Sequence, residues 1–193
     1  MTEIVFRRVD ERIGEIALRP VDPDADAELL HAWLTHAKCA FWGMLDYDLD
    51  AVRQRFRDIA AGDTHADFIG LHRGKPSCLF ERYETASELG PDVYTPQAGD
   101  ASIHFLAAPT DEPVAGFTMA GIKTMVEFLL ADPAVRRVVG EPDVRNRAML
   151  RLVSSVGFRI EREIQLPDKR AYLCTATREQ YHAALAAEPV PAR

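Results

Sequence analysis

A histidine, an aspartate and a glycine-containing loop could together support proton transfer beside an anionic ligand. His104 lies within an apolar run, residues 100–107, and Asp143 follows a second run, residues 137–141. Histidine and carboxylate side chains are the usual general bases. Gly116 lies where a loop leads into a helical pattern, and N–H groups at a helix N-terminus bind phosphate. Each also has a structural interpretation: a hydrogen-bonded histidine, a helix-capping aspartate and a plain connecting loop.

The hydrophobic pattern predicts an α/β chain that would position these residues. The predicted strands are residues 4–6, 13–19, 67–72, 76–83, 100–107, 137–141, 158–166 and 171–176. The predicted helices are residues 22–32, 48–60, 116–130 and 146–156, with Gly157 at the C′ position of the last. Turns are expected at residues 11–12 and 73–75. We therefore expect a mixed central sheet of about seven strands, flanked by helices on both faces.

Two consequences follow from this pattern. The strands on either side of the helix at residues 116–130 should be parallel neighbours, joined by a right-handed crossover. Because side chains alternate along a strand, His104 should face away from both Ile103 and Phe105. By the same alternation, Glu81 and Arg82 should lie on opposite faces, and one of them could enter a site.

Length and composition exclude several classes of protein. The chain has 193 residues, enough for one domain, which we expect over residues 1–187, and a Pro- and Ala-containing tail at 188–193 that should be loose. A net charge of −7 argues against a nucleic-acid surface. No apolar run approaches a membrane span, and the N-terminus lacks a secretory pattern. Three widely spaced cysteines form no zinc motif and indicate a reduced, cytoplasmic protein.

A more specific pattern follows the predicted crossover. Glu141-Pro142-Asp143-Val144-Arg145-Asn146, with Gly157-Phe158 downstream, resembles the E-P-D-x-R-N … G-F signature of siderophore acyltransferases, which belong to the GNAT superfamily. Further blocks that resemble this family are residues 31–36, 41–42, 80–83 and 103–106, and the resemblance covers residues 16–177. At residues 113–118 the chain keeps only the glycine of the family's Q/R-x-x-G-x-G/A pattern. The resemblance is closest to the N-hydroxycadaverine acyltransferases of desferrioxamine pathways.

The resemblance implies a GNAT fold, an acyl-CoA co-substrate such as acetyl-CoA or succinyl-CoA, and no metal. It implies that His104 and Asp143 are catalytic. The residues expected to bind the cofactor are Phe105, Leu106, Ala107, Ala115, Gly116, Phe117, Thr118 and Asn146. The residues expected to bind the substrate are Trp33, His36, Trp42 and Glu81, although the two tryptophans could instead belong to an aromatic core. Asn146 could equally cap the following helix.

The implied reaction is a direct transfer of the acyl group to a small amine or hydroxylamine, forming a hydroxamate from N-hydroxycadaverine. Either His104 or Asp143 would accept the proton, and N–H groups near residues 105–107 would stabilise the developing oxyanion. No cysteine has an evident histidine partner, so a covalent route is not expected. Lysine, N6-hydroxylysine or another small amine remains an alternative acceptor, as does a non-catalytic acyl-CoA-binding module. A monomer and a homodimer are both open, and no nucleic-acid or membrane partner is expected.

Overall fold

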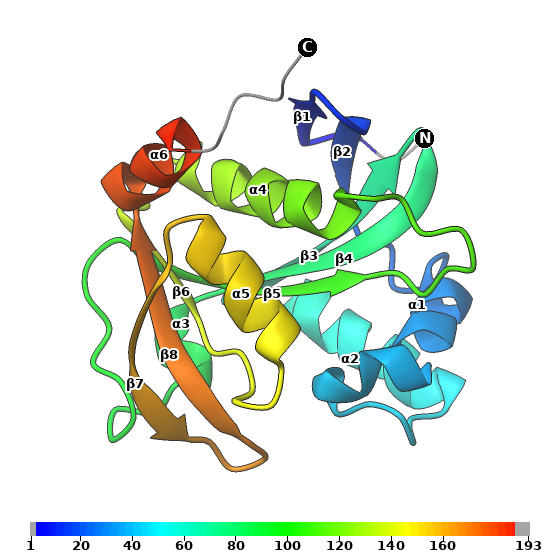
Figure 1. Ribbon diagram of the computed structural model, residues 1–193. Helices are drawn as coiled ribbons and strands as arrows, with labels where there is room; N and C mark the ends of the chain where they lie inside the picture. The colour runs from blue at the N-terminus through cyan, green and yellow to red at the C-terminus, as the bar shows by residue number, and fades with distance from the viewer. Residues whose placement is uncertain (1–2, 188–193) are drawn as a thin grey trace. The chain divides into compact units, whose positions relative to one another are not determined.

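The first four strands form an antiparallel meander. In the computed structural model, which describes residues 3–187, β1 (Phe6–Asp10), β2 (Gly14–Pro20), β3 (His65–His72) and β4 (Lys75–Tyr83) pair in sequence order (Figure 1). At the β3–β4 turn, Arg73 has a φ of 52° and Gly74 a φ of 75°. Two consecutive left-handed residues are what a tight two-residue hairpin requires. Both predicted hairpins are confirmed.

The predicted parallel pairing of the strands on either side of the helix at residues 116–130 is also confirmed. β5 (Asp100–Ala107) pairs in parallel with β6 (Arg137–Gly140), and α4 (Phe117–Leu130) lies between them in the chain. β8 (Arg170–Thr177) adds antiparallel to β6, and β7 (Arg159–Gln165) pairs antiparallel with β8. The mixed sheet therefore has eight strands, in the order β1-β2-β3-β4-β5-β6-β8-β7, where about seven were expected.

The chain divides into two compact units, which we describe separately. The first comprises Met1–Tyr83 and His104–Met125, and the second comprises Glu84–Ile103 and Val126–Arg193. Both β5 and α4 contribute residues to each unit. The tail expected at residues 188–193 lies outside the described part of the chain. Within residues 3–187, no helix is both long and apolar enough to cross a membrane.

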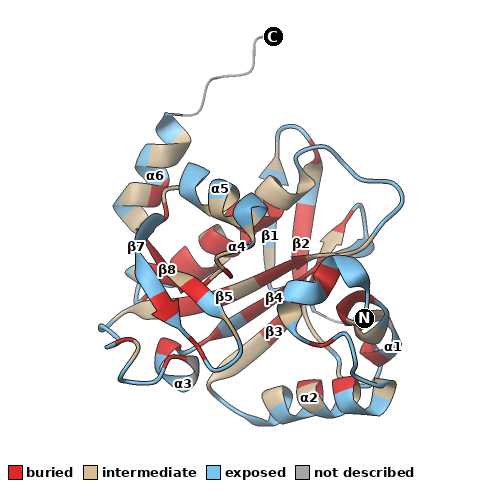
Figure 2. Cartoon of the chain, turned by 60° about the horizontal axis from the view of Figure 1, so that its bottom comes forward, coloured by how far each residue is buried: buried red, intermediate tan, exposed pale blue. Residues whose placement is uncertain are grey.

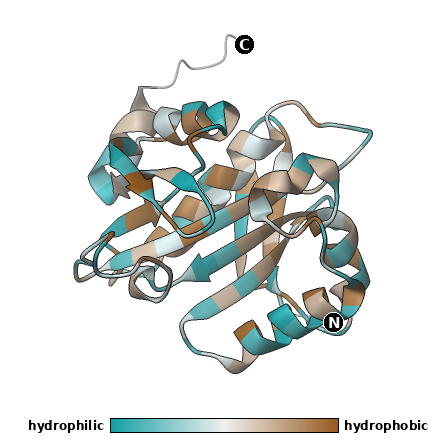
Figure 3. Cartoon of the chain, turned by 90° about the horizontal axis from the view of Figure 1, so that it is seen from below, coloured by the Kyte–Doolittle hydropathy of each residue, from teal (hydrophilic) through white to brown (hydrophobic). Residues whose placement is uncertain are grey.

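In the first unit, helices cover both faces of the strands. α1 (Ala27–Leu34), the 3-10 helix η1 (Ala37–Trp42) and α2 (Leu49–Ala61) cover one face. Their apolar core includes Leu30, Leu34, Val52, Phe56, Ile69, Leu79 and Leu106. On the other face, a Cβ on Gly121 of α4 would lie 2.7 Å from the Phe105 ring, so the helix approaches the strand closely. Buried residues run along β3, β4 and β5 (Figure 2), and hydrophilic and hydrophobic residues alternate along the helices (Figure 3).

The first helix is shorter than predicted. The Asp22 carboxylate accepts hydrogen bonds from the backbone N–H groups of Asp24 and Ala25, each at 3.0 Å. Arg19 holds both carboxylate oxygens of Asp26 at 2.7 Å. These contacts fix a separate turn over the acidic stretch, and α1 begins only at Ala27.

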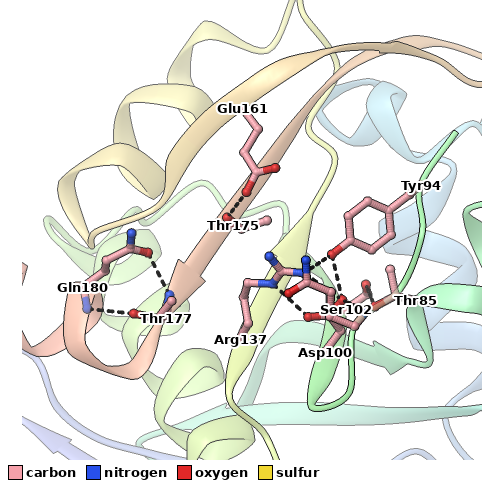
Figure 4. Close-up of polar contacts among 10 residues, drawn as sticks. Thr85, Tyr94, Asp100, Ser102, Arg137, Glu161, Thr175, Thr177 and Gln180 are labelled. Carbon is pink, nitrogen blue, oxygen red and sulfur yellow. Dashed lines mark hydrogen bonds and ion pairs between the residues drawn. The ribbon is translucent and has the colours of Figure 1, made fainter.

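The second unit has its own apolar core. It includes Leu89, Tyr94, Val139, Ile164 and Leu173. Arg137 of β6 is hydrogen-bonded through Nε to Asp100 of β5 at 2.8 Å, and Tyr94 donates to the same carboxylate at 2.7 Å (Figure 4). Besides the end of α4, the described part of this unit contains α3 (Thr85–Glu88), α5 (Arg147–Ser155) and α6 (Arg178–Ala186). Of these, only α5 was predicted.

Candidate active site

His104 is held between two residues of the neighbouring strand. Its Nδ1 lies 2.9 Å from Oε2 of Glu81, and its Nε2 lies 3.1 Å from the Tyr83 hydroxyl. The Trp42 ring meets the imidazole edge-on, with centroids 5.9 Å apart. Phe105 instead packs against Phe80, with ring centroids 5.4 Å apart. His104 and Phe105 therefore lie on opposite faces, as strand alternation predicts.

For the neutral imidazole, the hydrogen bonds assign the tautomer of His104. An ionised carboxylate can only accept, so Nδ1 carries the hydrogen that Glu81 receives. Nε2 then has a lone pair, which accepts from the Tyr83 hydroxyl. The His104 side chain is 32% exposed whereas that of Glu81 is 2% exposed, so His104 is the member of this pair that a substrate can reach. This arrangement makes Nε2 the basic atom of the site.

A second carboxyl group lies beside Glu81. The β3–β4 register places Asp67 directly opposite Glu81, and both are buried. Arg55 donates from Nη2 to Oε1 of Glu81 at 2.8 Å. Neither oxygen of Asp67 has a hydrogen-bond partner among the described residues.

Burial and neighbouring charges shift the pKa values of the two carboxyl groups in opposite directions. Burial, reinforced by the charge of Glu81, raises the pKa of Asp67. Burial would also raise the pKa of Glu81, but the contacts with His104 and Arg55 outweigh it and hold that pKa below its usual range. The pair therefore holds a single negative charge, on Glu81, which is the group bonded to the histidine.

The loop before α4 is open around Gly116. Gly116 is exposed with a φ of 85°, and a Cβ there would meet nothing within 4 Å. α4 begins at Phe117, whose backbone N–H donates to the Val114 carbonyl at 3.1 Å, and Thr118 follows it in the first turn. Ala115 is exposed, and Phe117 and Thr118 are half-buried. At the end of β5, Phe105 and Leu106 are buried and Ala107 is half-buried. Binding of a CoA pyrophosphate by these residues stays a prediction.

Asp143 lies in the second unit, where it is paired with Arg145. Its Oδ1 accepts hydrogen bonds from the backbone N–H of Arg145 at 2.8 Å and from the Arg145 side-chain Nε at 2.9 Å. Its Oδ2 accepts from Nη2 of the same side chain at 2.6 Å. The hydrogen bonds from Arg145 lower the pKa of Asp143. Asn146 caps α5, because its side chain accepts from the Met149 N–H at 3.1 Å. The cap is thus Asn146 rather than Asp143, and the catalytic role of Asp143 stays a prediction.

The other predicted pocket residues occupy different surroundings. Trp42 contacts His104, whereas Trp33 is 7% exposed and belongs to the apolar core of the first unit. His36 is exposed and starts η1, where its Nδ1 accepts from the Lys38 N–H at 3.1 Å. Glu81 was expected to contact substrate, and its carboxylate contacts His104 and Arg55 instead of solvent. Binding of substrate by these residues stays a prediction.

Sequence reasoning gave no role to Arg55, Asp67 or Tyr83. One signal was available, because Asp67 and Glu81 are acidic residues inside otherwise apolar strand patterns. The three cysteines are buried, and burial raises the pKa of each thiol, that of Cys174 to about 12. Across the described residues, no group of three or more histidine, cysteine or acidic side chains could hold a metal ion.

Comparison with known proteins identifies the family. The model of the acetyltransferase (GNAT) domain matches residues 22–166. The N(6)-hydroxylysine O-acetyltransferase of Escherichia coli is 26% identical over 180 residues, which are 92% of this chain and 57% of that protein. The lysine N-acyltransferase MbtK of Mycobacterium sp. (strain MCS) is 26% identical over 158 residues, 81% of this chain and 65% of that protein. The chain therefore spans less than two thirds of the length of both relatives.

A solved structure shows the same fold. The crystal structure of the aminoglycoside acetyltransferase AAC(6')-Ib with coenzyme A has a TM-score of 0.76 and 22% identity, covering 87% of this chain and 98% of that one. This likeness concerns the backbone, and the match to the domain model extends over more than half of the chain. The chain belongs to the acetyltransferase (GNAT) domain family.

Proposed function

We propose that this protein is an acyl-CoA-dependent N-acyltransferase whose acceptor is a small amine or hydroxylamine. The observation that carries the proposal is the hydrogen-bonded arrangement of Glu81, His104 and Tyr83, which leaves Nε2 of a half-exposed histidine as a base. The family supplies the reaction class. The names of the two relatives, which refer to lysine and N6-hydroxylysine, favour an acceptor with an aliphatic chain ending in nitrogen.

His104 is the proposed base rather than Asp143. The Asp143 carboxylate is held by Arg145 and its pKa is lowered, so it is a weak proton acceptor. The Tyr83 hydroxyl gives up the Nε2 lone pair of His104 when the acceptor binds, Nε2 then takes the proton from the attacking nitrogen, and the Glu81 carboxylate stabilises the resulting imidazolium. The nitrogen forms a bond to the acyl carbon, the carbon–sulfur bond breaks, and the proton passes from His104 to the leaving sulfur.

Residues 115–118 are the proposed contact for the pyrophosphate of the acyl-CoA. The open Gly116 and the N–H groups that follow Phe117 in the first α4 turn support this assignment. When bound, the thioester supplies an activated acetyl or succinyl group. Backbone N–H groups at residues 105–107 would polarise its carbonyl.

The finer proposal is that the acceptor is N-hydroxycadaverine and the product a hydroxamate for siderophore assembly. It rests on the E-P-D-x-R-N block at residues 141–146. A hydroxylamine nitrogen is much less basic than an alkyl amine and is largely unprotonated at neutral pH. A single histidine base therefore suffices for the transfer.

The test is CoA release by the purified protein. Acetyl-CoA and succinyl-CoA are each offered N-hydroxycadaverine, cadaverine and N6-hydroxylysine, and products are scored for the ferric colour of a hydroxamate. His104→Ala should lower kcat about 100-fold or more, because a positioned base contributes ~10²–10⁴-fold. His182→Ala, on the exposed surface of α6, is the matched control.

The outcomes separate the proposals. Rapid release with N-hydroxycadaverine and a coloured product would support both the reaction and the acceptor. Activity restricted to N6-hydroxylysine would keep the acyltransferase and overturn the acceptor. No release with any pair would overturn the siderophore proposal in favour of a different GNAT acceptor or a binding module.

A further inference from the structure

Arg55 binds, through the second oxygen, the same carboxylate that holds His104. Its Nη2 donates to Oε1 of Glu81 at 2.8 Å, while Nδ1 of His104 donates to Oε2 at 2.9 Å. Arg55 comes from α2, 26 residues before Glu81 in the chain. Its side chain is 38% exposed, whereas that of Glu81 is 2% exposed. The buried carboxylate is therefore shared between a histidine and a guanidinium, and the proposed reaction assigns the guanidinium no role.

The other ionisable groups around Glu81 come from α2, β3 and β4. Arg55 of α2 stays charged throughout the pH range of the reaction. Asp67 of β3 lies directly opposite Glu81, and neither of its oxygens has a hydrogen-bond partner in the described part of the chain. Burial raises the pKa of Asp67, so this carboxyl group is neutral. The ring of His65 stacks on that of Tyr83, with centroids 5.4 Å apart. With the histidines neutral, the charges of Arg55 and Glu81 therefore cancel.

Loss of the guanidinium would change the proton balance of the histidine–carboxylate pair. A proton on His104 would oppose the charge of Glu81 in place of Arg55, so the pair would keep that proton to a higher pH. The proton occupies Nε2, either in an imidazolium or, with the Nδ1 hydrogen shifted to Glu81, in the Nε2–H tautomer. In both forms Nε2 has no lone pair for the attacking nitrogen. Asp58 lines the same surface cavity as Arg55, but it is exposed, so water screens its charge.

We propose that Arg55 is a positioning residue that keeps Nε2 of His104 free of a proton at neutral pH by neutralising the Glu81 carboxylate. A carboxylate alone would favour the imidazolium, which is the wrong state for a base. The cation bound to the same carboxylate removes that preference and leaves the hydrogen bond to Nδ1 in place. The inference rests on the proposed function and deepens it, because it adds the group that makes the histidine available as a base.

The first test compares the pH dependence of kcat between Arg55→Gln and the unmodified protein, with saturating acetyl-CoA and the acceptor that the CoA-release assay identifies. The acidic limb of the profile should move up by about one pH unit, because a partly exposed neighbouring charge shifts a pKa by roughly that amount. On that limb the variant should be about tenfold slower. The alkaline plateau should be retained. Arg55→Lys keeps the charge and should move the limb less.

The second test does not depend on turnover. NMR titration of the ring nitrogens of His104, assigned with His104→Ala, should show the neutral Nδ1–H tautomer in the unmodified protein at neutral pH. The titration midpoint should be about one pH unit higher in Arg55→Gln. That variant should fold, because the pair takes up a proton in place of the lost cation. Arg57→Gln is the matched control, since Arg57 lies on the same helix, is exposed and pairs with Asp24. Its profile and midpoint should match those of the unmodified protein.

The outcomes separate this inference from the proposed function. A lower plateau in Arg55→Gln, with the acidic limb and the NMR midpoint unmoved, would show that Arg55 only supports the structure and would overturn this inference alone. A protonated His104 in the unmodified protein at neutral pH would also overturn it, and that measurement needs no variant of Arg55. Absence of turnover by the unmodified protein with every acceptor would overturn the siderophore proposal. The NMR midpoint would then still decide whether Arg55 controls the protonation of His104.

Discussion

At the residue scale, two carboxyl groups share one buried site although only one negative charge is stabilised there. Arg55 and His104 both contact Glu81, and neither oxygen of Asp67 has a hydrogen-bond partner among the residues that the structure describes. An ionised carboxylate in such a position would be buried without hydrogen bonds and would repel Glu81. The protonated form of Asp67 avoids both costs and leaves the histidine facing a single carboxylate. His65, Tyr83 and Arg55 are further polar groups near this site.

The first prediction concerns the pH dependence of stability. Because the folded pKa of Asp67 is raised, the folded state keeps a proton that the unfolded state loses near pH 4. The contribution to the free energy of unfolding is therefore greatest below that pH and falls as pH rises toward the raised value. Asp67→Asn removes this fall. The stability of the variant relative to the unmodified protein should increase from about pH 5 to about pH 7, by up to roughly 1.4 kcal/mol per pH unit.

Denaturant unfolding at the two pH values measures this difference. Asp63→Asn, at an exposed position just before β3, is the control and should show no pH-dependent gain. A gain for Asp67→Asn that is the same at both pH values would show that the residue is not held protonated.

The limits of sequence reasoning at this scale are clear from Glu81. Strand alternation predicts that Glu81 and Arg82 face opposite sides, and the structure has Glu81 buried and Arg82 exposed. Which of them faces inward depends on Asp67 of β3 and Arg55 of α2, which are distant in sequence. His104 and Trp42 were recognised from motif blocks, and the structure brings them together. The roles of Arg55 and Asp67 require the tertiary packing.

At the scale of elements, the join between α5 and β7 depends on a glycine. Gly157 has a φ of 93°, and a Cβ there would lie 2.6 Å from the backbone oxygen of Gln180 in α6. The Phe158 N–H bonds back to the carbonyl of Val153 at 3.1 Å, which closes the end of α5. Gly157 therefore has a left-handed backbone conformation and also lies in close contact with α6.

The prediction is that Gly157→Ala destabilises the protein by about 3 kcal/mol, through backbone strain and displacement of α6. Gly14→Ala is the matched control, because Gly14 has a φ of 86° but nothing within 4 Å of its would-be Cβ. That variant should lose only about 1 kcal/mol. If thermal or denaturant unfolding shows the same loss of stability for both variants, α6 moves aside for the added methyl group without a measurable energetic cost.

Long periodic elements were predictable, and short ones were not. The hairpin at Gly74, the parallel crossover and the C′ glycine all followed from local pattern. η1 and α3 have six and four residues, too few to show helical periodicity. α6 was missed although Thr177 and Gln180 form a capping box that the sequence displays (Figure 4).

At the scale of the whole molecule, the division into two units could not be inferred from local pattern. Leu106 of β5 belongs to the first core and Val139 of β6 to the second, and no composition shift or linker separates them in the chain. The boundary passes through β5 between Ile103 and His104. Fold class and family were recognisable because motif blocks and the crossover depend on residues close in sequence.

The buried thiols offer a test of whether the two units unfold together. Cys39 and Cys78 lie in the first unit and Cys174 in the second, and all three are buried with raised pKa values. Because the thiolate is the reactive form, none should react with an alkylating reagent in the native protein. β5 and α4 run through both units, so loss of one unit removes part of a strand and a helix from the other.

We therefore predict that all three cysteines become reactive in a single transition along a denaturant series, as cooperative unfolding requires. Pulse alkylation followed by peptide mass spectrometry measures each site in the unmodified protein and avoids substitutions in the cores. Labelling of Cys174 at a lower denaturant concentration than Cys39 and Cys78, or the reverse order, would contradict the prediction. It would mean that the shared strand and helix do not couple the units, and that one of them opens while the other remains folded.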